Sequence, residues 1–564
     1  MPAAAPDEAR DESTRIHGSL VGHDGEPVPL AQIELTLTGH EPVVVPVEAD
    51  GSFALTIPEP GWATLRMTGV SHAEHEIGFA PSGGDHQLSV RLGTYARPDA
   101  AVEPVRGFGR YDGEGGRVNV TFARRDDGTW VATVERSEAN TTAKEFHYQI
   151  RDATSVGRTI NGTSADRYVY DGGGDYFSVL TLSDADSFEI VHDPAALPPA
   201  GAEPELRHGD PGSSIARSAA LNERIQAWKA EAQDAAVAAA AASPDLDLGE
   251  AMRARTDELR ARIEAAIEAE DDPVLRKMLF VALGDTLNRG LARGLGDAVD
   301  LGQRAKQAEQ AKRILAELGP RDPIWAMNEG AIANALAFVD DHQYFTLAAN
   351  DHPDPAVGAW LWLSTLLDAD ATGDLDRARE AVEALADPRF AANPMLILAS
   401  LYDPNRLTAP GRPVPEFRLR SADGKLEYSA EGMAGKPYVL DFWATWCGPC
   451  VAEMPQLHGA YAALNGQQPR DDRKYRKVAK PKLEIISISL DGDPKIVGKF
   501  RKDEWPMPWA HVVPAEPLKA QLREDFGVVG VPMMVLVGAD GIILASSPRL
   551  TSGNLSEIAG ELLR

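Results

Sequence analysis

The chain has 564 residues, of which 43% are apolar and 25% charged. These values lie close to the averages of globular proteins and argue against a collagen-like, coiled-coil or wholly disordered chain, and the length predicts several domains. The formal net charge of -29 disfavours a nucleic-acid partner, because binding of phosphate backbones requires a basic face.

The negative charge is distributed unevenly. From Thr408 to the end there are 20 Lys and Arg against 19 Asp and Glu, which leaves 36 basic and 66 acidic residues in the first 407. A nearly neutral C-terminal part therefore follows a strongly acidic body. The simplest interpretation is a solvated surface that favours solubility, and a docking face for a basic partner is the alternative.

The first residues, MPAAAPDEARDEST, have acidic groups where an export signal would have basic ones, and no apolar run follows them. We expect residues 1–14 to form a disordered tail. The chain contains no run that approaches the roughly 18 apolar residues of a membrane span, so no transmembrane segment is expected.

Residues 15–93 are predicted to form β structure. The runs AQIELTLTG and GSFALTI alternate apolar and polar residues, and clusters of Gly, Pro and Asp separate them. We expect a small β-sandwich. The order of its turns and strands resembles the carboxypeptidase-regulatory-like domain, a transthyretin-like sandwich, and this resemblance concerns the fold and not an activity.

A second β-rich region is predicted for residues 94–195. The run RVNVTFARRDDGTWVATVE reads as two strands joined by a turn at Asp127-Gly128, and further alternating runs follow. Four aromatic residues flank the sequence DGGGD: Tyr168, Tyr170, Tyr176 and Phe177. They could form a platform for a ligand, or they could be ordinary core residues and cross-strand pairs.

The next two segments differ sharply in composition. Residues 196–214 are rich in Pro, Gly and charge, which predicts a linker. In residues 215–402, apolar residues recur every three or four positions, which predicts an all-α domain. Without self-similarity at a fixed period, a helical-repeat array and an irregular helical domain remain equal alternatives. Either could present a surface to a protein partner.

The last domain is predicted for residues 403–564, and its first segment, 403–417, carries four prolines that end the helical region. It contains the only two cysteines of the chain, in the run DFWATWCGPC. The apolar run KPYVLDFWA predicts a strand, and CGPCVAEMPQLHGAYAAL predicts a helix. Cys447 therefore lies at a junction between a strand and a helix.

This position favours redox chemistry. Unpaired N–H groups and the macrodipole at a helix N-terminus favour negative charge, so a cysteine there ionises more easily to an attacking thiolate. Cys450 lies one turn further along, near enough to form a disulfide with Cys447, and Gly448 and Pro449 shape the turn between them. The pair can therefore cycle between a dithiol and a disulfide.

Two other interpretations of the pair are weaker. Structural zinc requires four ligands, and His458 and His511 alone would complete the site poorly. An inert structural disulfide is the other alternative, although such a small loop gains little stability from a cross-link. We expect no metal and no cofactor other than the redox-active disulfide Cys447–Cys450.

The run VLDFWATWCGPC matches the active-site strand of thioredoxin-fold proteins. The wider run GRPVPEFRLRSADGKLEYSAEGMAGKPYVLDFWATWCGPCVAEMP resembles the TlpA and ResA type of thiol-disulfide oxidoreductase. Downstream, a strand, a helix, a Val-Pro and two further strands follow in the order of that family. The whole chain is thus expected to have two β-sandwich-like domains, a central helical domain and a C-terminal α/β thioredoxin-fold domain.

The resemblance implies roles for four catalytic residues. Cys447 would attack a disulfide, and Cys450 would resolve the mixed disulfide. Asp441 and Glu453 would carry protons, since a carboxyl group in an apolar setting has a raised pKa. The alternatives are that Asp441 is only a satisfied buried acid and that Glu453 is a solvated helix charge.

Five further residues are expected to shape the site. The resemblance implies a cis peptide bond between Val531 and Pro532, with the proline facing the sulfurs. Trp446 would shield the nucleophile and contact the partner. Gly448, Pro449 and Val531 would tune the balance between thiol and disulfide.

The resemblance implies a thiol-disulfide oxidoreductase, and the CGPC core favours a protein disulfide reductase, with an oxidase as the open alternative. Its partners would be a disulfide-containing protein substrate and an upstream thiol reductant, in the periplasm or cell envelope, although without a visible export signal a cytoplasmic location stays open. One alternative is a thiol peroxidase of peroxiredoxin type, but Leu440 and Ala444 stand where its motif requires Pro and Thr or Ser. The other is a binding scaffold with an accessory redox domain.

One segment departs from the family. The connection NGQQPRDDRKYRKVAKPK, residues 465–482, is longer and more basic than this position requires. It could be a solvated loop, or it could dock on the acidic body or on an acidic client.

Overall fold

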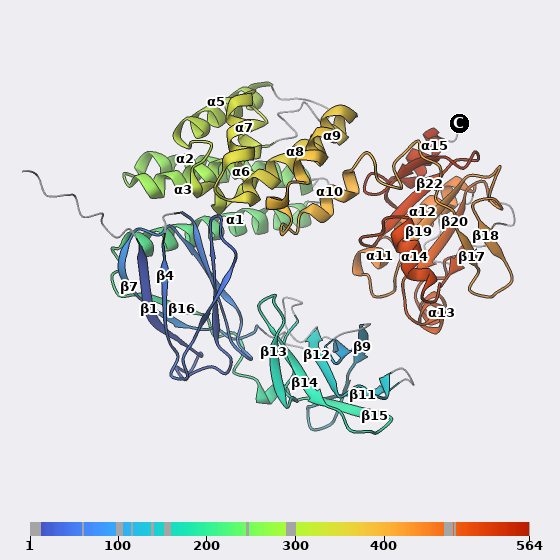
Figure 1. Cartoon of the computed structure of the whole chain (residues 1–564), viewed down its shortest axis with the longest axis horizontal. Helices are drawn as coiled ribbons and strands as arrows, with labels where there is room; N and C mark the ends of the chain where they lie inside the picture. Colours follow the sequence, from blue (N-terminus) through green and yellow to red (C-terminus); the bar gives the residue numbers. More distant parts are fainter. Residues whose placement is uncertain are drawn as a thin grey trace, which may run out of the picture. The chain divides into compact units, whose positions relative to one another are not determined.

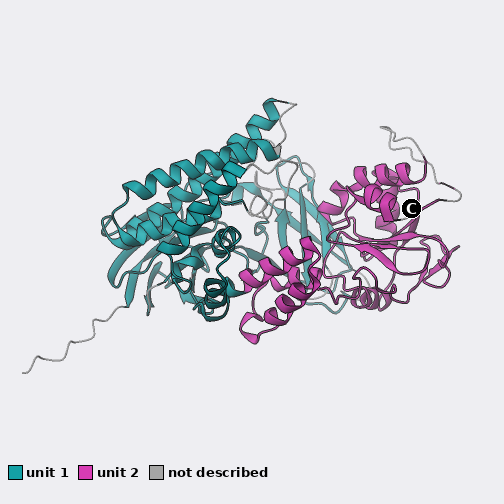
Figure 2. Cartoon of the chain, turned by 90° about the horizontal axis from the view of Figure 1, so that it is seen from above, with its two compact units in different colours: residues 1–358 teal, residues 359–564 magenta. Residues whose placement is uncertain are grey.

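The computed structural model describes residues 13–58, 61–96, 105–113, 117–136, 140–151, 159–243, 248–288, 301–466, 478 and 481–562 (Figure 1). Most of the predicted tail and most of the basic connection 465–482 lie outside these residues. The chain divides into two compact units, Met1–Gly358 and Ala359–Arg564 (Figure 2). Within the described residues, no helix is long and apolar enough to cross a membrane.

The first β region contains two four-stranded sheets. One has the order β16 (Glu205–His208), β7 (Gly84–Arg91), β1 (Thr14–Val21), β4 (Ser52–Ile57), and the other β3 (Val43–Pro46), β2 (Gln32–Leu37), β5 (Ala63–Thr68), β6 (His75–Phe79). Every second residue of β4 is buried, as the alternation predicts. Ile57 of the first sheet and Ile33 of the second belong to one hydrophobic core.

Strand β16 lies inside segment 196–214, which the composition predicts to be a linker. It pairs with β7 in antiparallel register, with Leu206 opposite Val90. Its four residues are too few for a clear alternating pattern, and the Pro and Gly around them obscure it. Part of the predicted linker is therefore an edge strand of the first β region.

The second β region has a larger and a smaller sheet. Their orders are β13 (Arg167–Tyr170), β14 (Tyr176–Thr181), β12 (Glu145–Arg151), β8 (Arg106–Tyr111), β9 (Val118–Thr121) and β10 (Ala123–Arg124), β11 (Trp130–Glu135), β15 (Ser187–His192). Phe146 from the larger sheet and Trp130 from the smaller one belong to one core. The predicted turn at Asp127-Gly128 joins β10 to β11.

Helices follow, as the three- and four-residue spacing predicts. They are α1 (Ser214–Ala242), α2 (Leu248–Ala269), α3 (Pro273–Asp285), α5 (Leu301–Glu317), α6 (Glu329–Leu336), α7 (His342–Asp351), α8 (Pro355–Thr372), α9 (Leu375–Leu385) and α10 (Leu396–Tyr402). Ile215 and Ala219 of α1 enter the core of the first β region. The boundary between the two units falls within α8, so α9 and α10 belong to the same unit as the last domain, although the composition changes only at residue 403.

The last domain has a five-stranded sheet with helices on both faces. Its order is β21 (Ala510–Val512), β20 (Glu484–Ser489), β19 (Tyr438–Trp443), β22 (Met533–Val537), β23 (Ile543–Ser546), and β19 runs parallel to β20 and antiparallel to β22. The other elements are β17 (Arg418–Arg420), β18 (Glu427–Ser429), α11 (Gly448–Ala452), α12 (Met454–Leu464), α13 (Pro494–Asp503), α14 (Leu518–Asp525) and α15 (Leu555–Leu562).

Strand β19 is buried along its whole length. Successive side chains of a strand point to opposite faces, so Val439 and Trp443 enter the core with α12, α13 and α15. Leu440 and Phe442 enter the core on the other face, which includes residues of α14. The sheet therefore holds β19 between two separate cores.

We expect Leu440→Ala to destabilise this domain by about 2–5 kcal/mol, because Leu440 is fully buried and the substitution leaves a cavity. Leu426→Ala is the matched control, since Leu426 is 50% exposed. Its effect should stay within about 0.5 kcal/mol. Proteolysis of the full chain at increasing urea concentration, with detection of fragments from residues 403–564, measures both. Equal effects of the two substitutions would contradict the burial of Leu440.

Candidate active site

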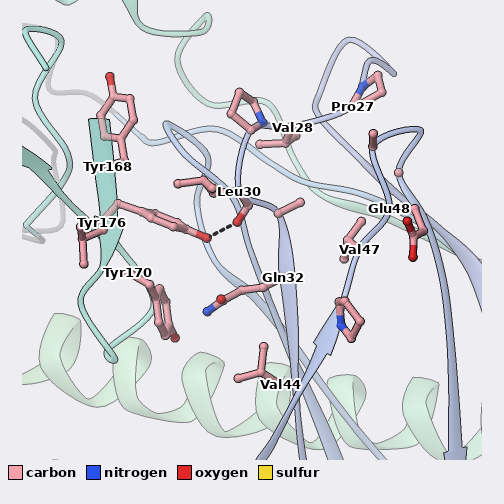
Figure 3. A pocket seen from close by; sticks show the side chains of 16 residues that line it. Pro27, Val28, Leu30, Gln32, Val44, Val47, Glu48, Tyr168, Tyr170 and Tyr176 are labelled. Carbon is pink, nitrogen blue, oxygen red and sulfur yellow. Dashed lines mark hydrogen bonds between the residues drawn. The ribbon is translucent and has the colours of Figure 1, made fainter. Parts of the chain in front are cut away.

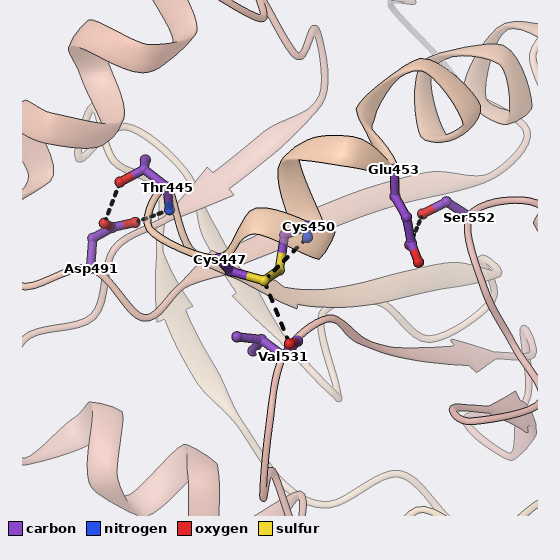
Figure 4. Close-up of a disulfide and its surroundings, with 7 residues drawn as sticks. All are labelled: Thr445, Cys447, Cys450, Glu453, Asp491, Val531 and Ser552. Carbon is purple, nitrogen blue, oxygen red and sulfur yellow. Dashed lines mark hydrogen bonds between the residues drawn. A yellow bond between two sulfur atoms is a disulfide. The ribbon is translucent and has the colours of Figure 1, made fainter. Parts of the chain in front are cut away.

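The two cysteines lie at the end of β19, where the chain turns into α11. Cys447 is the N-cap residue of α11, and the backbone N–H of Cys450 donates to Cys447 Sγ over 3.2 Å. A disulfide joins the two residues, whose Cα atoms are 5.3 Å apart (Figure 4). Both residues are buried, at 5% and 3% exposure. The predicted strand-to-helix junction is therefore present, with the first cysteine at the helix terminus.

A buried aspartate, Asp491, holds the loop that leads to Cys447. The N–H and Oγ1 of Thr445 donate to its carboxylate over 2.9 and 2.7 Å (Figure 4), and Ser489 Oγ donates to it over 2.7 Å. Asp491 follows β20, and adjacent parallel strands end at the same edge of a sheet. The acidic run SLDGD after a predicted strand indicates a carboxylate at the edge of the sheet. The contact of Asp491 with Thr445 depends on the strand pairing and does not follow from the run alone.

The segment Val531–Pro532 approaches the disulfide from the start of β22. Its peptide bond is cis, in agreement with the resemblance, and the carbonyl oxygen of Val531 lies 3.5 Å from Cys447 Sγ (Figure 4). In the register of β22 with β19, Met533 is opposite Phe442. The pairing of these two strands thus brings Val531 to the sulfur.

The two residues beside Cys447 in the sequence, Trp446 and Gly448, are loosely packed. Trp446 is 46% exposed, although its neighbour Cys447 is buried. A Cβ added to Gly448 would meet no atom within 4 Å, so packing does not require a glycine there. Pro449 lies in the first turn of α11, where its missing N–H leaves no helical hydrogen bond unmade.

Asp441 points to the disulfide side of the sheet. Alternation along β19 gives it the same face as Val439 and Trp443, which share a core with both cysteines. Only 2% of Asp441 is exposed, and this burial raises its pKa to about 7. The hydrogen bond from Ser487 opposes the rise, and the charge of Glu453 adds to it.

A chain of two hydrogen bonds holds the Asp441 carboxyl group. Ser487 Oγ donates to Asp441 Oδ2 over 2.6 Å, and Trp509 Nε1 donates to Ser487 Oγ over 2.8 Å. Ser487 is opposite Asp441 in the parallel pairing of β20 with β19. Sequence reasoning missed both Ser487 and Trp509, because their relation to Asp441 arises from strand register.

Glu453 lies between α11 and α12 and is only partly exposed. Ser552 Oγ, from the loop before α15, donates to Glu453 Oε2 over 2.8 Å (Figure 4). The side chain is therefore held by the fold, in contrast to the alternative of a freely solvated helix charge. Ser552 is another contact that no local pattern predicts.

The two histidines considered for zinc contact backbone carbonyl groups. His458 Nδ1 lies 2.9 Å from the oxygen of Met454, and His511 Nε2 lies 3.1 Å from the oxygen of Met507. In the part of the chain that the structure describes, no three or more Cys, His, Asp or Glu residues group as metal ligands would.

The aromatic residues around DGGGD lie in the other unit. Tyr168, Tyr170 and Tyr176 border a cavity of about 850 Å³ together with residues of the first β region (Figure 3). The hydroxyl of Tyr176 donates to the carbonyl oxygen of Leu30 over 2.7 Å. Phe177 points to the opposite face of β14 and contacts Phe108 edge to face. A ligand platform made of all four aromatic residues is therefore not formed, and binding by the three tyrosines stays a prediction.

Comparisons with known proteins agree on the last domain. The family described as Thioredoxin-like matches residues 435–543. The chain is 32% identical to the thiol-disulfide oxidoreductase ResA of Oceanobacillus iheyensis over 113 residues, which are 20% of this chain and 52% of that protein. It is 32% identical to the thiol:disulfide interchange protein DsbE of Escherichia coli over 148 residues, which are 25% of this chain and 67% of that protein.

A solved structure is also similar. The thioredoxin domain of a thiol-disulfide oxidoreductase from Bacteroides vulgatus is 22% identical, with a TM-score of 0.23 and coverage of 28% of this chain and 99% of that one. The chain spans about half the length of the ResA protein and two thirds of the DsbE protein. These relatives, the family match and the CGPC motif with its disulfide confirm the resemblance of the C-terminal domain. The chain belongs to the thioredoxin-like family of thiol-disulfide oxidoreductases that includes ResA and DsbE.

Proposed function

We propose that the protein reduces disulfides of other proteins with the dithiol form of Cys447 and Cys450. The observation that carries this proposal is the Cys447–Cys450 disulfide at a helix N-terminus, beside the carbonyl group of Val531. Such a pair can store two electrons and transfer them by thiol exchange. No further cofactor is needed for this reaction.

The reaction begins with the thiolate of Cys447. It attacks one sulfur of the client disulfide, so that a mixed disulfide forms and the other client sulfur leaves as a thiolate. Cys450 then loses its proton and attacks Cys447 Sγ, which releases the second client thiolate and forms the disulfide of the enzyme. Two client thiols are formed after protonation, and an upstream thiol reductant restores the dithiol.

Cys447 is the better nucleophile of the two for a geometric reason. It caps α11, and its sulfur accepts the N–H of Cys450. A hydrogen bond to the charged form and the helix macrodipole both stabilise a thiolate. Cys450 is inside the helix, where it reaches Cys447 but is less accessible to a client.

Asp441 is the proposed proton carrier for Cys450. A carboxyl group with a pKa of about 7 exchanges protons readily near neutral pH. It shares the disulfide side of the sheet, and Ser487 fixes one of its oxygens. Glu453 is proposed as a second carboxylate near this path, because its charge adds to the rise of the Asp441 pKa.

The residues before the thioredoxin-like domain are assigned only a fold and a general role. The shared cores of the paired sheets support two β-sandwich-like domains. The first is proposed to be of carboxypeptidase-regulatory type from its sequence resemblance alone. The helical segment is proposed as a surface for a protein partner. Neither alternative function is favoured, since the relatives are named for thiol-disulfide chemistry and Leu440 and Ala444 depart from the peroxidase motif.

We expect Cys450→Ser to accumulate a mixed disulfide with client proteins that contain disulfides. Cys447 can still attack such a disulfide, but no second cysteine is left to resolve the adduct. Cys447→Ser should form no adduct and should lose reduction of insulin by at least about 10³-fold. Non-reducing gel electrophoresis and insulin turbidity measure these results. Adducts of equal yield in both variants would remove the assignment of Cys447 as the nucleophile.

Asp441→Asn should slow insulin reduction at pH 7 by about 10²-fold, because the proton acceptor is lost.

The same substitution, Asp441→Asn, should stabilise the domain against unfolding at high pH. The pKa of Asp441 is about 7 when folded, against about 3.9 when unfolded, so the folded wild type loses stability as the pH rises from 4 to 7. The stability gain of the variant should therefore be full above pH 7 and absent near pH 4, as urea unfolding at several pH values would test.

Ser487→Ala changes the pKa of Asp441 without removing its carboxyl group. It removes the hydrogen bond that lowers the Asp441 pKa, so the alkaline rise of kcat should move to higher pH while the carboxyl group remains. The pH dependence of insulin reduction measures the shift. An unchanged profile would argue that Asp441 does not carry the proton.

A further inference from the structure

A pocket of about 340 Å³ lies beside the Val531–Pro532 segment within the second unit. Its walls include Val531 and Pro532, Glu453, four residues after β23 (Ser547, Pro548, Leu550 and Thr551), and two residues of α10, Ile397 and Leu401. Val531 belongs to both the pocket and the disulfide site, because its carbonyl oxygen lies 3.5 Å from Cys447 Sγ. The pocket and the disulfide site therefore share the residue Val531.

Helix α10 precedes the thioredoxin-like domain in the chain, and two polar contacts attach this helical segment to the domain. Arg549 Nε donates to Asp370 Oδ2 over 2.7 Å, in an ion pair with α8. Arg406 Nη2, four residues after α10, donates to Ser546 Oγ over 3.3 Å. Ser546 and Arg549 are neighbours of the pocket residues Ser547, Pro548 and Leu550, so the two contacts hold the chain before and after α10 to this wall.

The chemistry of the pocket favours an apolar occupant. Ile397 is 58% exposed and Val529, another wall residue, is 41% exposed, so apolar surface faces solvent there. The one carboxylate in the lining, Glu453, already accepts a hydrogen bond from Ser552. An apolar side chain that enters would remove this surface from water.

The shared residue Val531 also points to the occupant. An extended chain advances about 3.3–3.6 Å per residue, so the residues next to the client cysteine stay close to the sulfur and to Val531. The occupant is thus part of the same polypeptide that presents the disulfide. The shared residue separates the pocket from an unrelated apolar patch elsewhere on the surface.

We propose that Ile397 and Leu401 of α10 determine specificity, by binding an apolar side chain that flanks the reacting cysteine of a client polypeptide. The proposal rests on the proposed reductase function and adds a substrate class to it. A segment outside the thioredoxin-like fold would then select which disulfides the common chemistry reaches.

The test uses the full chain and two peptide disulfides that differ only in the residues on either side of the cysteine, Leu in one and Asp in the other. The wild type should favour the Leu peptide by about 10-fold or more in kcat/KM, the range for one apolar group in a pocket. In the double variant Ile397→Ser, Leu401→Ser this ratio should fall to about 2 or less. Ile397→Lys, at an exposed position, should invert the preference toward the Asp peptide.

Leu375→Ser is the matched control. Leu375 is 55% exposed on α9 and is not part of the pocket wall, so this variant should keep the wild-type ratio. A wild-type ratio near 1, or a ratio that Ile397→Lys and the double variant leave unchanged, would overturn the proposal. So would an equal loss of selectivity in Leu375→Ser.

A redox-independent measurement separates this proposal from the reductase function. Fluorescence anisotropy measures the binding of labelled peptides in which Ser replaces the cysteine. If the wild type reduces no disulfide but still binds the Leu peptide more tightly, and Ile397→Lys abolishes this difference, the pocket assignment stands and the reductase function falls. Binding without a difference between the two peptides would overturn the pocket assignment in every case.

Discussion

The pairing of β19 with two neighbouring strands is the constraint on which the site depends. Its parallel pairing with β20 places Ser487 opposite Asp441 and brings Asp491 to the loop before Cys447. Its antiparallel pairing with β22 brings Val531 to the sulfur of Cys447. Three segments distant in sequence thus meet at one edge of the sheet because a single strand is paired on both sides. A slip of one residue would turn Asp441 to the other core and separate these groups.

The same burial creates an energetic conflict at Asp441. A strand that lies between two cores is stabilised by apolar side chains, and a carboxyl group there costs free energy when it ionises. Ser487 offsets part of this cost through its hydrogen bond but leaves the pKa of Asp441 near 7, and Trp509 in turn donates to Ser487. A carboxyl group that is poorly suited to stability is, for this reason, suited to accept and return a proton at neutral pH.

The sequence pattern predicted the parts of the site whose residues are neighbours in the chain. The strand, the helix terminus at Cys447 and the Val531–Pro532 segment follow from alternation and from the motif with its family resemblance. Asp491, Ser487 and Ser552 could not be predicted, because their roles arise from register and loop packing between distant segments. In the fold, the same limit concealed β16, whose four residues become a strand only by pairing with β7. Composition likewise indicated a boundary at residue 403, whereas α9 and α10 group with the last domain.

That grouping has a physical consequence for the chemistry. An exposed ion pair such as Asp370 with Arg549 contributes little stability alone, on the order of 0–1 kcal/mol. Here it acts together with Arg406 and with the apolar contacts around the pocket, on a segment that directly precedes the redox domain. The Cys447–Cys450 pair supplies the reaction, whereas the pocket residues Ile397 and Leu401 lie in a helix before the thioredoxin-like domain. If α10 selects clients as proposed, substitutions there alter the surface beside Val531 without any change at the cysteines, so different segments control substrate choice and reactivity.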